Sequence, residues 1–308
     1  MNDRQTGSVA WVFPGQGSQK VGMGLDLAQH DATAATVLDS ADETLEFDLS
    51  DMIFYGPDEE LQRTANQQPA IVAVSTAYLV ALRDRGLLPE PVAVAGHSLG
   101  EYSALVAVDA LDLADALRLV RKRGELMQEH GSGTMAAIIG LDTEAVTQVA
   151  SEAGAEVANF NAPGQTTVSG REETVERAMA LAKEHGARRC VRLPVSAAFH
   201  SSLMAPVVDG LRPLIEKTAF RQATVPLVTN VDASPIQHPD DLRQELLNQI
   251  CASVRWIDVV ERLRRDGVST FIEIGPGQVL TGLISRIAKG AQTVVAEDVL
   301  AQEPDQRP

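Results

Sequence analysis

The chain has 308 residues, 44% of them hydrophobic and 22% charged, which allows one or two domains with a substantial core and excludes a low-complexity or disordered chain. Its formal net charge of −16 argues against general nucleic-acid binding, because neutralising phosphates requires an excess of Lys and Arg. Cys190 and Cys251 lie far apart without metal-ligand spacing, so we expect two buried free thiols. The polar start and the short apolar runs predict a cytoplasmic protein without a membrane span.

The first part of the chain alternates strand and helix patterns. The apolar run 9–13 predicts a buried strand that ends in a glycine-rich loop, and the run 91–96 predicts a central parallel strand. Helices are expected at 34–45, 69–86, 98–108 and 112–131. This alternation favours an α/β sheet with helices on both faces.

Residues 134–195 follow a different order of elements. Strands are expected at 134–140, 156–161, 165–170 and 188–195, and helices at 142–154 and 171–186. This β-α-β-β-α-β order is typical of a ferredoxin-like arrangement. We therefore expect a ferredoxin-like small domain, residues 133–196, inserted into a main α/β domain formed by residues 1–132 and 197–308.

The rest of the main domain is expected to contain two further strands and two further helices. The expected strands are 225–230 and 270–277, and the expected helices are 241–250 and 279–287. The tail after Leu300 is expected to be frayed.

A G-x-S-x-G pattern, Gly96-His97-Ser98-Leu99-Gly100, lies between a predicted strand and a predicted helix. That context is the one a nucleophilic serine requires, because small neighbours permit a sharp turn and the helix N-terminus favours developing negative charge. The N–H of Leu99 would point to a developing oxyanion. A structural role for Ser98 in a tight turn is the alternative.

A nucleophilic serine needs a base, and His200 is the best placed of the six histidines. It follows the last predicted strand of the small domain, where the chain re-enters the main domain, and interdomain clefts often hold functional sites. His97 is adjacent to Ser98, and neighbours across a sharp turn rarely face each other. A structural role for His200 remains equally open.

Arg123 falls on the apolar side of the predicted helix 112–131, together with Leu119 and Leu126. A guanidinium in apolar surroundings is costly unless it is paired with an anion. It could form a structural salt bridge, with Glu101 or Glu273, or it could clamp a substrate carboxylate.

The glycine-rich loop "GQGSQ" lacks the pattern of a phosphate-binding loop and the third glycine of a dinucleotide fingerprint. We expect it to supply a second oxyanion donor, a backbone N–H near Gln16. No cluster of Cys, His or carboxylates has metal-ligand spacing, so we expect no metal.

Seven motifs, found in order between residues 9 and 287, resemble those of the malonyl-CoA:acyl carrier protein transacylases of fatty-acid synthesis. They are "FPGQGSQ", "GHSLGEYSAL", "RGELMQE", "GTMAAIIGL", "NFNAPGQTTVSG", "AAFHSSLM" and "FIEIGPGQVL". With the nucleophile pattern, the fold we expect is an α/β-hydrolase-like main domain carrying the ferredoxin-like insertion.

The resemblance implies a ping-pong transfer of malonyl from malonyl-CoA to the phosphopantetheine thiol of acyl carrier protein. Ser98, activated by His200, would carry the malonyl ester, and Arg123 would hold the malonyl carboxylate. A glutamine carbonyl, which maps onto Gln249, would orient the histidine. Two backbone N–H groups would form the oxyanion hole, those of Gln16 and Leu99. No permanently bound cofactor is implied, and we expect a monomer.

The resemblance also bears on substrate choice and on the carrier. In related polyketide acyltransferases, a phenylalanine directly before the histidine accompanies specificity for malonyl over methylmalonyl. Phe199 has this position, and its bulk would crowd an α-methyl group. Asn161 and Gln68 could line the pocket or be structural. We expect a local basic patch for the acidic carrier, with Arg188 and Arg189.

Three other functions stay open at this point. One is a free-standing malonyl acyltransferase that serves a polyketide synthase. The second is a related thioesterase or esterase, which would have no use for a carboxylate clamp. The third is a catalytically silent docking module, against which intact Ser98 and His200 argue.

Overall fold

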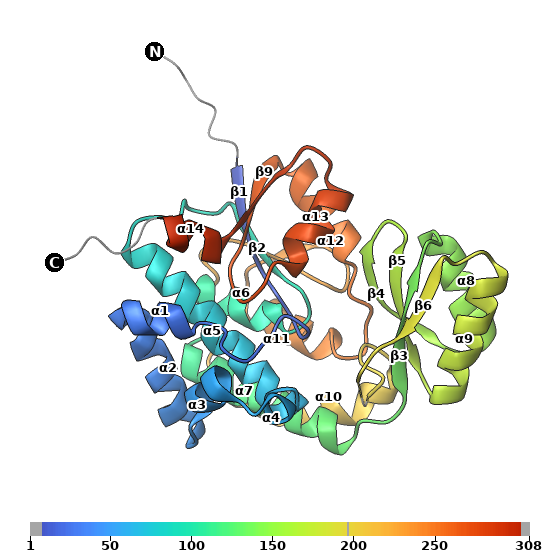
Figure 1. Ribbon diagram of the computed structural model, residues 1–308, viewed down its shortest axis with the longest axis horizontal. Coiled ribbons are helices and arrows are strands. Elements are labelled where there is room, and N and C mark those ends of the chain that lie inside the picture. Colours follow the sequence, from blue (N-terminus) through green and yellow to red (C-terminus); the bar gives the residue numbers. More distant parts are fainter. Residues whose placement is uncertain (1–7, 196, 303–308) are drawn as a thin grey trace, which may run out of the picture.

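The computed structural model describes residues 8–195 and 197–302, which form a mixed α/β structure with two β-sheets (Figure 1). The polar start of the chain and the tail beyond Gln302, to which two of the sequence predictions refer, lie outside the described residues. None of the described helices is both long and apolar enough to cross a bilayer.

The larger sheet has six strands in the order β10-β9-β1-β2-β7-β8. Their bounds are β1 Ser8–Phe13, β2 Ala93–Gly96, β7 Leu227–Val228, β8 Pro235–Ile236, β9 Val268–Glu273 and β10 Gln292–Val295. All neighbouring pairs are parallel except β7 and β8, and β1 pairs with β2 in the register Ala10 to Ala93. Parallel pairing brings the carboxyl ends of β1 and β2 to the same edge, where two glycine-rich turns meet.

Helices cover both faces of this sheet (Figure 1). One face packs against two helices, α12 Trp256–Arg265 and α13 Val279–Ile287. Most of the other helices contribute to the core on the opposite face. Their bounds are α1 Leu25–His30, α2 Ala32–Leu45, α3 Leu49–Tyr55, α4 Asp58–Leu61, α5 Thr64–Asp84, α6 Gly100–Ala107, α7 Leu113–Glu129, α10 Ala205–Lys217, α11 Pro239–Asn248 and α14 Ala296–Gln302.

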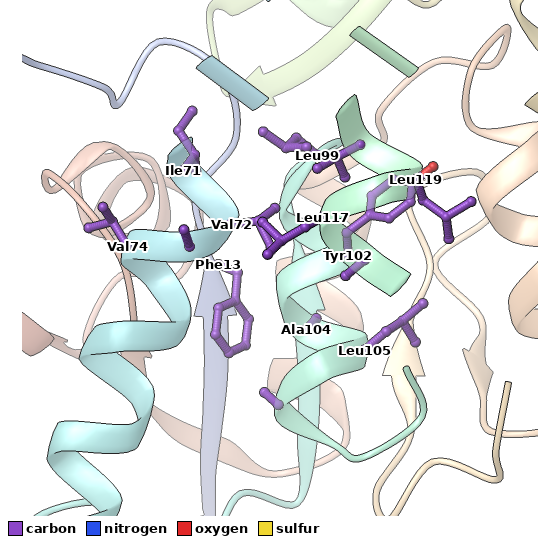
Figure 2. Packing of buried hydrophobic residues seen from close by; sticks show 14 of the residues in the cluster. Phe13, Ile71, Val72, Val74, Leu99, Tyr102, Ala104, Leu105, Leu117 and Leu119 are labelled. Carbon is purple, nitrogen blue, oxygen red and sulfur yellow. The ribbon is translucent and has the colours of Figure 1, made fainter. Parts of the chain in front are cut away.

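Strand β1 shows how the sequence builds both cores. Side chains alternate along a strand, so Ala10 and Val12 lie in the core under α12 and α13, whereas Trp11 and Phe13 lie in the opposite core. Figure 2 shows Phe13 in the space between α5 and α6. Its side chain is fully buried, which contributes about 2 to 3 kcal/mol to folding.

The second sheet has four antiparallel strands in the order β4-β5-β3-β6. Their bounds are β3 Thr134–Ile139, β4 Glu156–Ala162, β5 Gln165–Gly170 and β6 Arg189–Arg192. Helices α8 Thr143–Ala153 and α9 Glu172–Glu184 pack on this sheet and form a separate core with it. Asp142 caps α8 by accepting the N–H of Ala145, and Gly154 ends it in the left-handed conformation.

Several elements differ from the sequence prediction. Helix α5 begins at Thr64 instead of Pro69, so the proline lies inside the helix and Gln67 and Gln68 become helical. The predicted strand 225–230 is reduced to two residues, and helix α14 extends past Leu300 to Gln302. Six helices, α1, α3, α4, α10, α12 and α14, and the strands β8 and β10 had no predicted counterpart. The two cysteines are free, but both are half-buried rather than fully buried.

Candidate active site

Ser98 lies on a sharp turn between β2 and α6. Its φ of 51° is in the left-handed region, which is unusual for a residue with a side chain. A Cβ on Gly96 would overlap the backbone of Gly100, so this turn requires glycine at 96. The Ser98 N–H donates to Asn230 Oδ1 at 2.7 Å. Asn230 lies just after β7, the strand next to β2, so this bond fixes the turn to the neighbouring strand.

His200 lies beside the serine hydroxyl, although 102 residues separate them in sequence. The distance between Ser98 Oγ and His200 Nε2 is 2.8 Å. The other ring nitrogen, Nδ1, lies 2.8 Å from the carbonyl oxygen of Gln249 and 3.1 Å from that of Ala252. Two carbonyls can only accept, so Nδ1 carries the proton and Nε2 is free to accept from the serine.

Burial, and after it the positive charge of Arg123, lowers the pKa of His200 to about 3. The imidazole is therefore neutral, which is the state a general base requires. A carboxylate bound to Arg123 would cancel part of that charge and raise the pKa of His200 again.

Arg123 extends from α7 to the same hydroxyl and is 1% exposed. Its Nη2 donates to Ser98 Oγ at 3.1 Å and to Gln249 Oε1 at 3.3 Å, and its Nη1 donates to Gln68 Oε1 at 2.8 Å. Its Nε has no acceptor among the described residues. Burial lowers the pKa of the guanidinium, so the site carries a desolvated cation next to the nucleophile.

The structural salt bridge considered for Arg123 is not formed. No described carboxylate lies within ion-pairing distance of its guanidinium. Glu273 instead accepts the N–H groups of Leu280 and Thr281 at the start of α13. Glu101 accepts from Asn230 and Gln249. The guanidinium therefore hydrogen-bonds directly only to neutral groups, which leaves it able to bind an anion.

A cavity of about 750 Å³ opens over these residues. Its wall includes Ser98, His200 and Arg123, and residues of the second sheet complete it, among them Met135 and Asn161. This volume lies within the usual range of small-molecule binding sites.

Phe199 and Asn161 line this cavity, whereas Gln68 does not. Gln68 is fully buried behind the guanidinium of Arg123, to which it is hydrogen-bonded. Asn161 Oδ1 lies 2.9 Å from His97 Nε2, and the His97 ring stacks at a tilt on Trp256 with centroids 5.5 Å apart. His97 therefore braces the wall of the cavity.

The glycine-rich loop lies next to the serine turn. Gly15 faces the carbonyl of His97 so closely that a Cβ would clash with it. Gln16 is fixed on α5 by hydrogen bonds from its Nε2 to Thr64 Oγ1 and Gln67 Oε1, at 2.6 and 2.5 Å. Among the described residues, no acceptor is found for the backbone N–H of Gln16 or of Leu99. Both N–H groups are available to a ligand.

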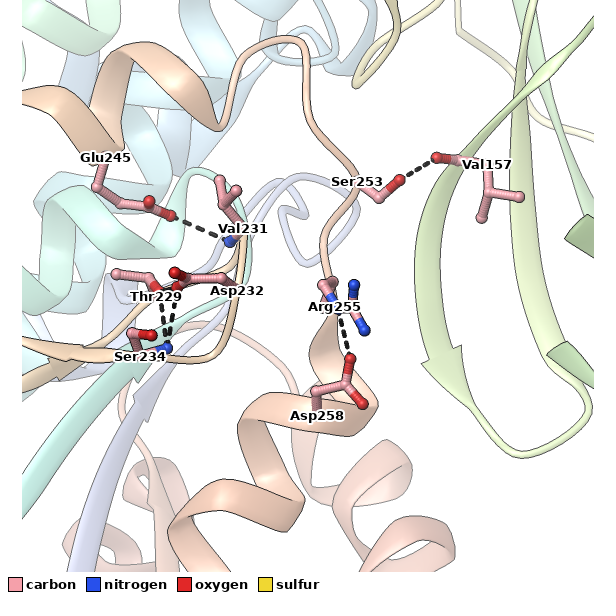
Figure 3. Close-up of polar contacts among 9 residues, drawn as sticks. All are labelled: Val157, Thr229, Val231, Asp232, Ser234, Glu245, Ser253, Arg255 and Asp258. Carbon is pink, nitrogen blue, oxygen red and sulfur yellow. Dashed lines mark hydrogen bonds and ion pairs between the residues drawn. The ribbon is translucent and has the colours of Figure 1, made fainter. Parts of the chain in front are cut away.

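The segment that orients His200 is attached to the second sheet. Val254 pairs with β4, since its N–H donates to Ala158 O and its carbonyl accepts from Phe160 N. Figure 3 shows the neighbouring bond from Ser253 Oγ to Val157 O, 2.5 Å long. The two carbonyls that face His200 are therefore held between the two sheets.

Three site residues were not identified from the sequence: Asn230, Ala252 and Glu245. Asn230 and Glu245 are buried polar residues, and Ala252 contributes only its carbonyl. No local pattern marks them, because they act across the fold. Within the described residues, no group of three or more His, Cys, Asp or Glu could hold a metal ion.

Comparison with protein families shows that the family model of the acyl transferase domain matches residues 10–307 of this chain. The chain belongs to this acyl transferase family. A malonyl CoA-acyl carrier protein transacylase of Bacillus subtilis is 44% identical over 298 residues, 94% of this chain and 93% of the relative. One from Escherichia coli K12 is 44% identical over 285 residues, 90% of this chain and 92% of the relative.

Solved acyl transferase structures agree with the sequence relatives. An acyl carrier protein S-malonyltransferase of Vibrio cholerae superposes with a TM-score of 0.90 at 42% identity, covering 94% of this chain and 96% of the other. A malonyl-transacylase in complex with its type II polyketide acyl carrier protein superposes with 0.92 at 39% identity, covering 96% and 100%. These findings confirm the resemblance drawn from the seven motifs.

Proposed function

We propose that the protein transfers a malonyl group from malonyl-CoA to the phosphopantetheine thiol of an acyl carrier protein. The observation that carries this proposal is the buried guanidinium of Arg123, which has no carboxylate partner among the described residues and donates to the nucleophile's oxygen. A site built for neutral acyl groups would gain nothing from such a cation. The names of the relatives at 41–44% identity support the same substrate.

In the first half-reaction, Ser98 Oγ attacks the thioester carbonyl carbon while its proton passes to Nε2 of His200. The negative oxygen that develops is stabilised by the N–H groups of Gln16 and Leu99. The carbon–sulfur bond then breaks, and the thiolate of CoA takes the proton from Nε2. The product is a malonyl ester on Ser98, and CoA leaves as the free thiol.

The second half-reaction reverses these roles. The carrier's pantetheine thiol gives its proton to Nε2 of His200 and attacks the ester carbonyl. The bond to Ser98 Oγ breaks, and Oγ recovers the proton. The carbonyl of Gln249 keeps Nδ1 protonated throughout, so the same nitrogen accepts and donates in both halves.

Arg123 would hold the malonyl carboxylate through two parallel N–H···O bonds. The guanidinium already lies 3.1 Å from Ser98 Oγ, so a three-carbon dicarboxylate half-thioester can span both groups. Phe199 on the cavity wall would crowd an α-methyl group and favour malonyl over methylmalonyl by about 1 to 3 kcal/mol.

The two sheets support a finer description of the fold. We infer an α/β-hydrolase-like main domain, residues 1–132 and 197–308, and a ferredoxin-like domain, residues 133–196. The strand order β4-β5-β3-β6 supports the ferredoxin-like part of this inference, and the serine turn after a central parallel strand supports the hydrolase-like part. We further infer a cytoplasmic monomer that keeps no cofactor between turnovers.

A carrier from polyketide synthesis is the second candidate for the acceptor. The similar malonyl-transacylase that was solved in complex with a type II polyketide acyl carrier protein favours it. Assay of the purified protein with carriers of both kinds, comparing kcat/KM, decides between them.

Replacing Arg123 tests the proposal. Arg123→Ala should lower kcat/KM for malonyl transfer roughly 150-fold, a loss of about 3 kcal/mol, because two charge-assisted hydrogen bonds disappear. Acetyl transfer, which has no carboxylate to lose, should be unchanged or faster. Transfer to a carrier is measured by the carrier's mass.

The matched control is Arg121→Ala on the same helix, whose guanidinium bonds Glu125 and Asn66 away from the cavity. It should change malonyl transfer by no more than about twofold. Equal losses for malonyl and acetyl in Arg123→Ala would reject the clamp and favour an esterase-like site.

A further inference from the structure

Two carboxyl groups are buried together beneath the serine turn. Glu101 in the first turn of α6 is fully buried, and Glu245 in α11 is 6% exposed. The Oε1 atoms of both accept the same N–H, that of Asn230, at 2.8 and 3.1 Å, and the two side chains are hydrogen-bonded to each other. Two carboxylates in such contact cannot both be ionised, so one proton lies between them.

Asn230 connects this pair to the nucleophile. Its Oδ1 accepts the N–H of Ser98 at 2.7 Å, and its Nδ2 donates to the carbonyl of Gly96 at 2.6 Å. Glu245 also accepts the N–H of Val231 at 3.2 Å, which Figure 3 shows at the turn after β7. The position of Asn230 thus depends on both carboxyl groups, and the strained turn at Ser98 depends on Asn230.

Gln249 connects the pair to the base and to the cation. Its Nε2 donates to Glu101 Oε2 at 3.0 Å and to Ser98 O at 3.2 Å, while its Oε1 accepts from Arg123 Nη2. Its backbone carbonyl faces His200 Nδ1. One buried residue therefore joins Glu101 to all three groups that the proposed reaction uses, to Ser98 and Arg123 through its side-chain amide and to His200 through its backbone carbonyl.

We propose that Glu101 and Glu245 are positioning residues that share one proton and thereby hold the reacting groups in place. They act through Asn230 and Gln249 and do not contact the substrate. With one proton, the pair carries a single negative charge, which balances Arg123 across the amide of Gln249. This inference rests on the proposed acyl transfer and deepens it.

The charges around the pair determine its response to pH. Burial and the neighbouring carboxyl group raise the pKa of Glu101, and burial raises the pKa of Glu245 to about 7. Asp232, in the turn between β7 and β8, adds to the rise at Glu245. Tyr102 on α6 stays protonated, since burial raises its pKa to about 12. The charge of Glu101 in turn acts to raise the pKa of Arg123 on α7.

Loss of the shared proton would place two negative charges in one buried contact. Repulsion between them should displace Asn230 and Gln249 and misalign Ser98 and His200. Because the folded-state pKa is raised, the stability that the pair contributes is present at low pH and is lost as the pH rises through the folded value. His200 acts as the base in its deprotonated form, so its own titration cannot lower the rate at alkaline pH, and an alkaline loss of rate reports on the pair.

The experiment measures the rate of serine malonylation by rapid quench and intact mass between pH 6 and 9.5, at saturating malonyl-CoA. The wild-type rate should fall at least roughly fivefold across this range, whereas Glu245→Gln, which carries a fixed neutral hydrogen-bonding group, should retain its pH 6 rate. Glu245→Ala should be slow at every pH, so that only the conservative variant rescues the rate.

Glu273→Gln is the matched control, because Glu273 is a fully buried carboxyl with a raised pKa that binds only the start of α13. Its rate should fall with pH as the wild type does. A flat wild-type profile, or an equal alkaline fall in Glu245→Gln, would overturn the proposal.

Should Glu245→Gln fail to fold, urea unfolding of Glu273→Gln decides, because this variant lacks the other buried carboxyl with a raised pKa and keeps the pair. A stability of Glu273→Gln that does not decrease from pH 6 to 9 would also overturn the proposal. Absence of any malonyl adduct at all pH values would instead refute the proposed function.

Discussion

Ser98 and His200 both adopt left-handed backbone conformations, with φ of 51° and 58°. For a residue with a Cβ this conformation costs about 1 to 3 kcal/mol, and it persists only where the surrounding structure enforces it. Around Ser98 those surroundings include Asn230, whose Oδ1 accepts the N–H of Ser98 and whose Nδ2 donates to the carbonyl of Gly96. The two strained backbone conformations place the Ser98 hydroxyl 2.8 Å from the His200 imidazole without the help of a substrate.

The low pKa of His200 predicts the pH dependence of acylation. Because kcat/KM reports groups of the free enzyme, kcat/KM for malonyl-CoA should show no acid limb between pH 7 and 5. An ordinary histidine base would lose most of its activity over this interval. Stopped-flow measurement of CoA release checks this, and a limb centred near pH 6.5 would contradict it.

The same shift affects stability with a defined sign. The unfolded chain protonates His200 near pH 6.5, whereas the folded chain does so only near pH 3. The unfolded state therefore binds more protons between these values, and the contribution of His200 lowers stability as the pH falls below about 6.5.

Helices α5 and α7 are in close contact, and this contact places the cation. Gly124, next to Arg123, faces α5 so closely that a Cβ would lie 2.6 Å from Thr64 O and 2.7 Å from Ala65 Cα. Gln68 of α5 then reaches the guanidinium of Arg123. A small residue at 124 is therefore needed for the two helices to hold Arg123 between them.

Substitution of two helical glycines tests this packing. Gly124→Ala should lower the free energy of unfolding by about 1 to 3 kcal/mol, although alanine favours helices, because α5 must move away. Gly282→Ala on α13 is the control: a Cβ there meets no atom within 4 Å, so a gain of up to about 1 kcal/mol is expected. Urea unfolding measures both, and a stabilised Gly124→Ala would refute the packing argument.

Which elements could be predicted depended on local signals. Strand β1 and the strand-turn-helix around Ser98 followed from apolar runs and glycines, as did the βαββαβ order of the second sheet. Helix α12 was missed even though Trp256, Val259, Val260 and Leu263 have helical spacing and are all buried. The arginines in its last turn make the segment strongly polar overall, so the apolar spacing was overlooked.

The same difference between local and long-range signals separates the residues of the site. Ser98 and Arg123 could be argued from a turn and a helix face, because both signals are local. Asn230 and Glu245 are brought to the site by the parallel pairing of β2 with β7 and by the position of α11, which no short stretch encodes. Gln249 was reached only through the family resemblance.

At the scale of the whole molecule, the cavity lies between the two sheets. Strand β6 leads into Leu193, Pro194 and Val195, which line the cavity. A carrier that delivers its thiol from this side would contact the exposed Arg188 and Arg189 at the start of β6. Since the chain has a net charge of −16, a local patch must supply the attraction for an acidic carrier.

Charge reversal at this patch should separate the two substrates. Arg188→Glu with Arg189→Glu should raise KM for the carrier roughly five- to tenfold and leave KM for malonyl-CoA unchanged. Arg118→Glu, on an exposed face of α7 paired with Asp115, is the control and should affect neither. Equal rises for both substrates would place the carrier elsewhere.

The central claim is that Ser98 carries the malonyl group, and intact-mass measurement of the protein after incubation with malonyl-CoA tests it most directly. The wild type should gain about 86 Da, the increment of a malonyl ester, and Ser98→Ala should gain nothing. Addition of holo acyl carrier protein should remove the adduct and transfer it to the carrier. An unmodified wild type, or an adduct that persists in Ser98→Ala, would contradict the account.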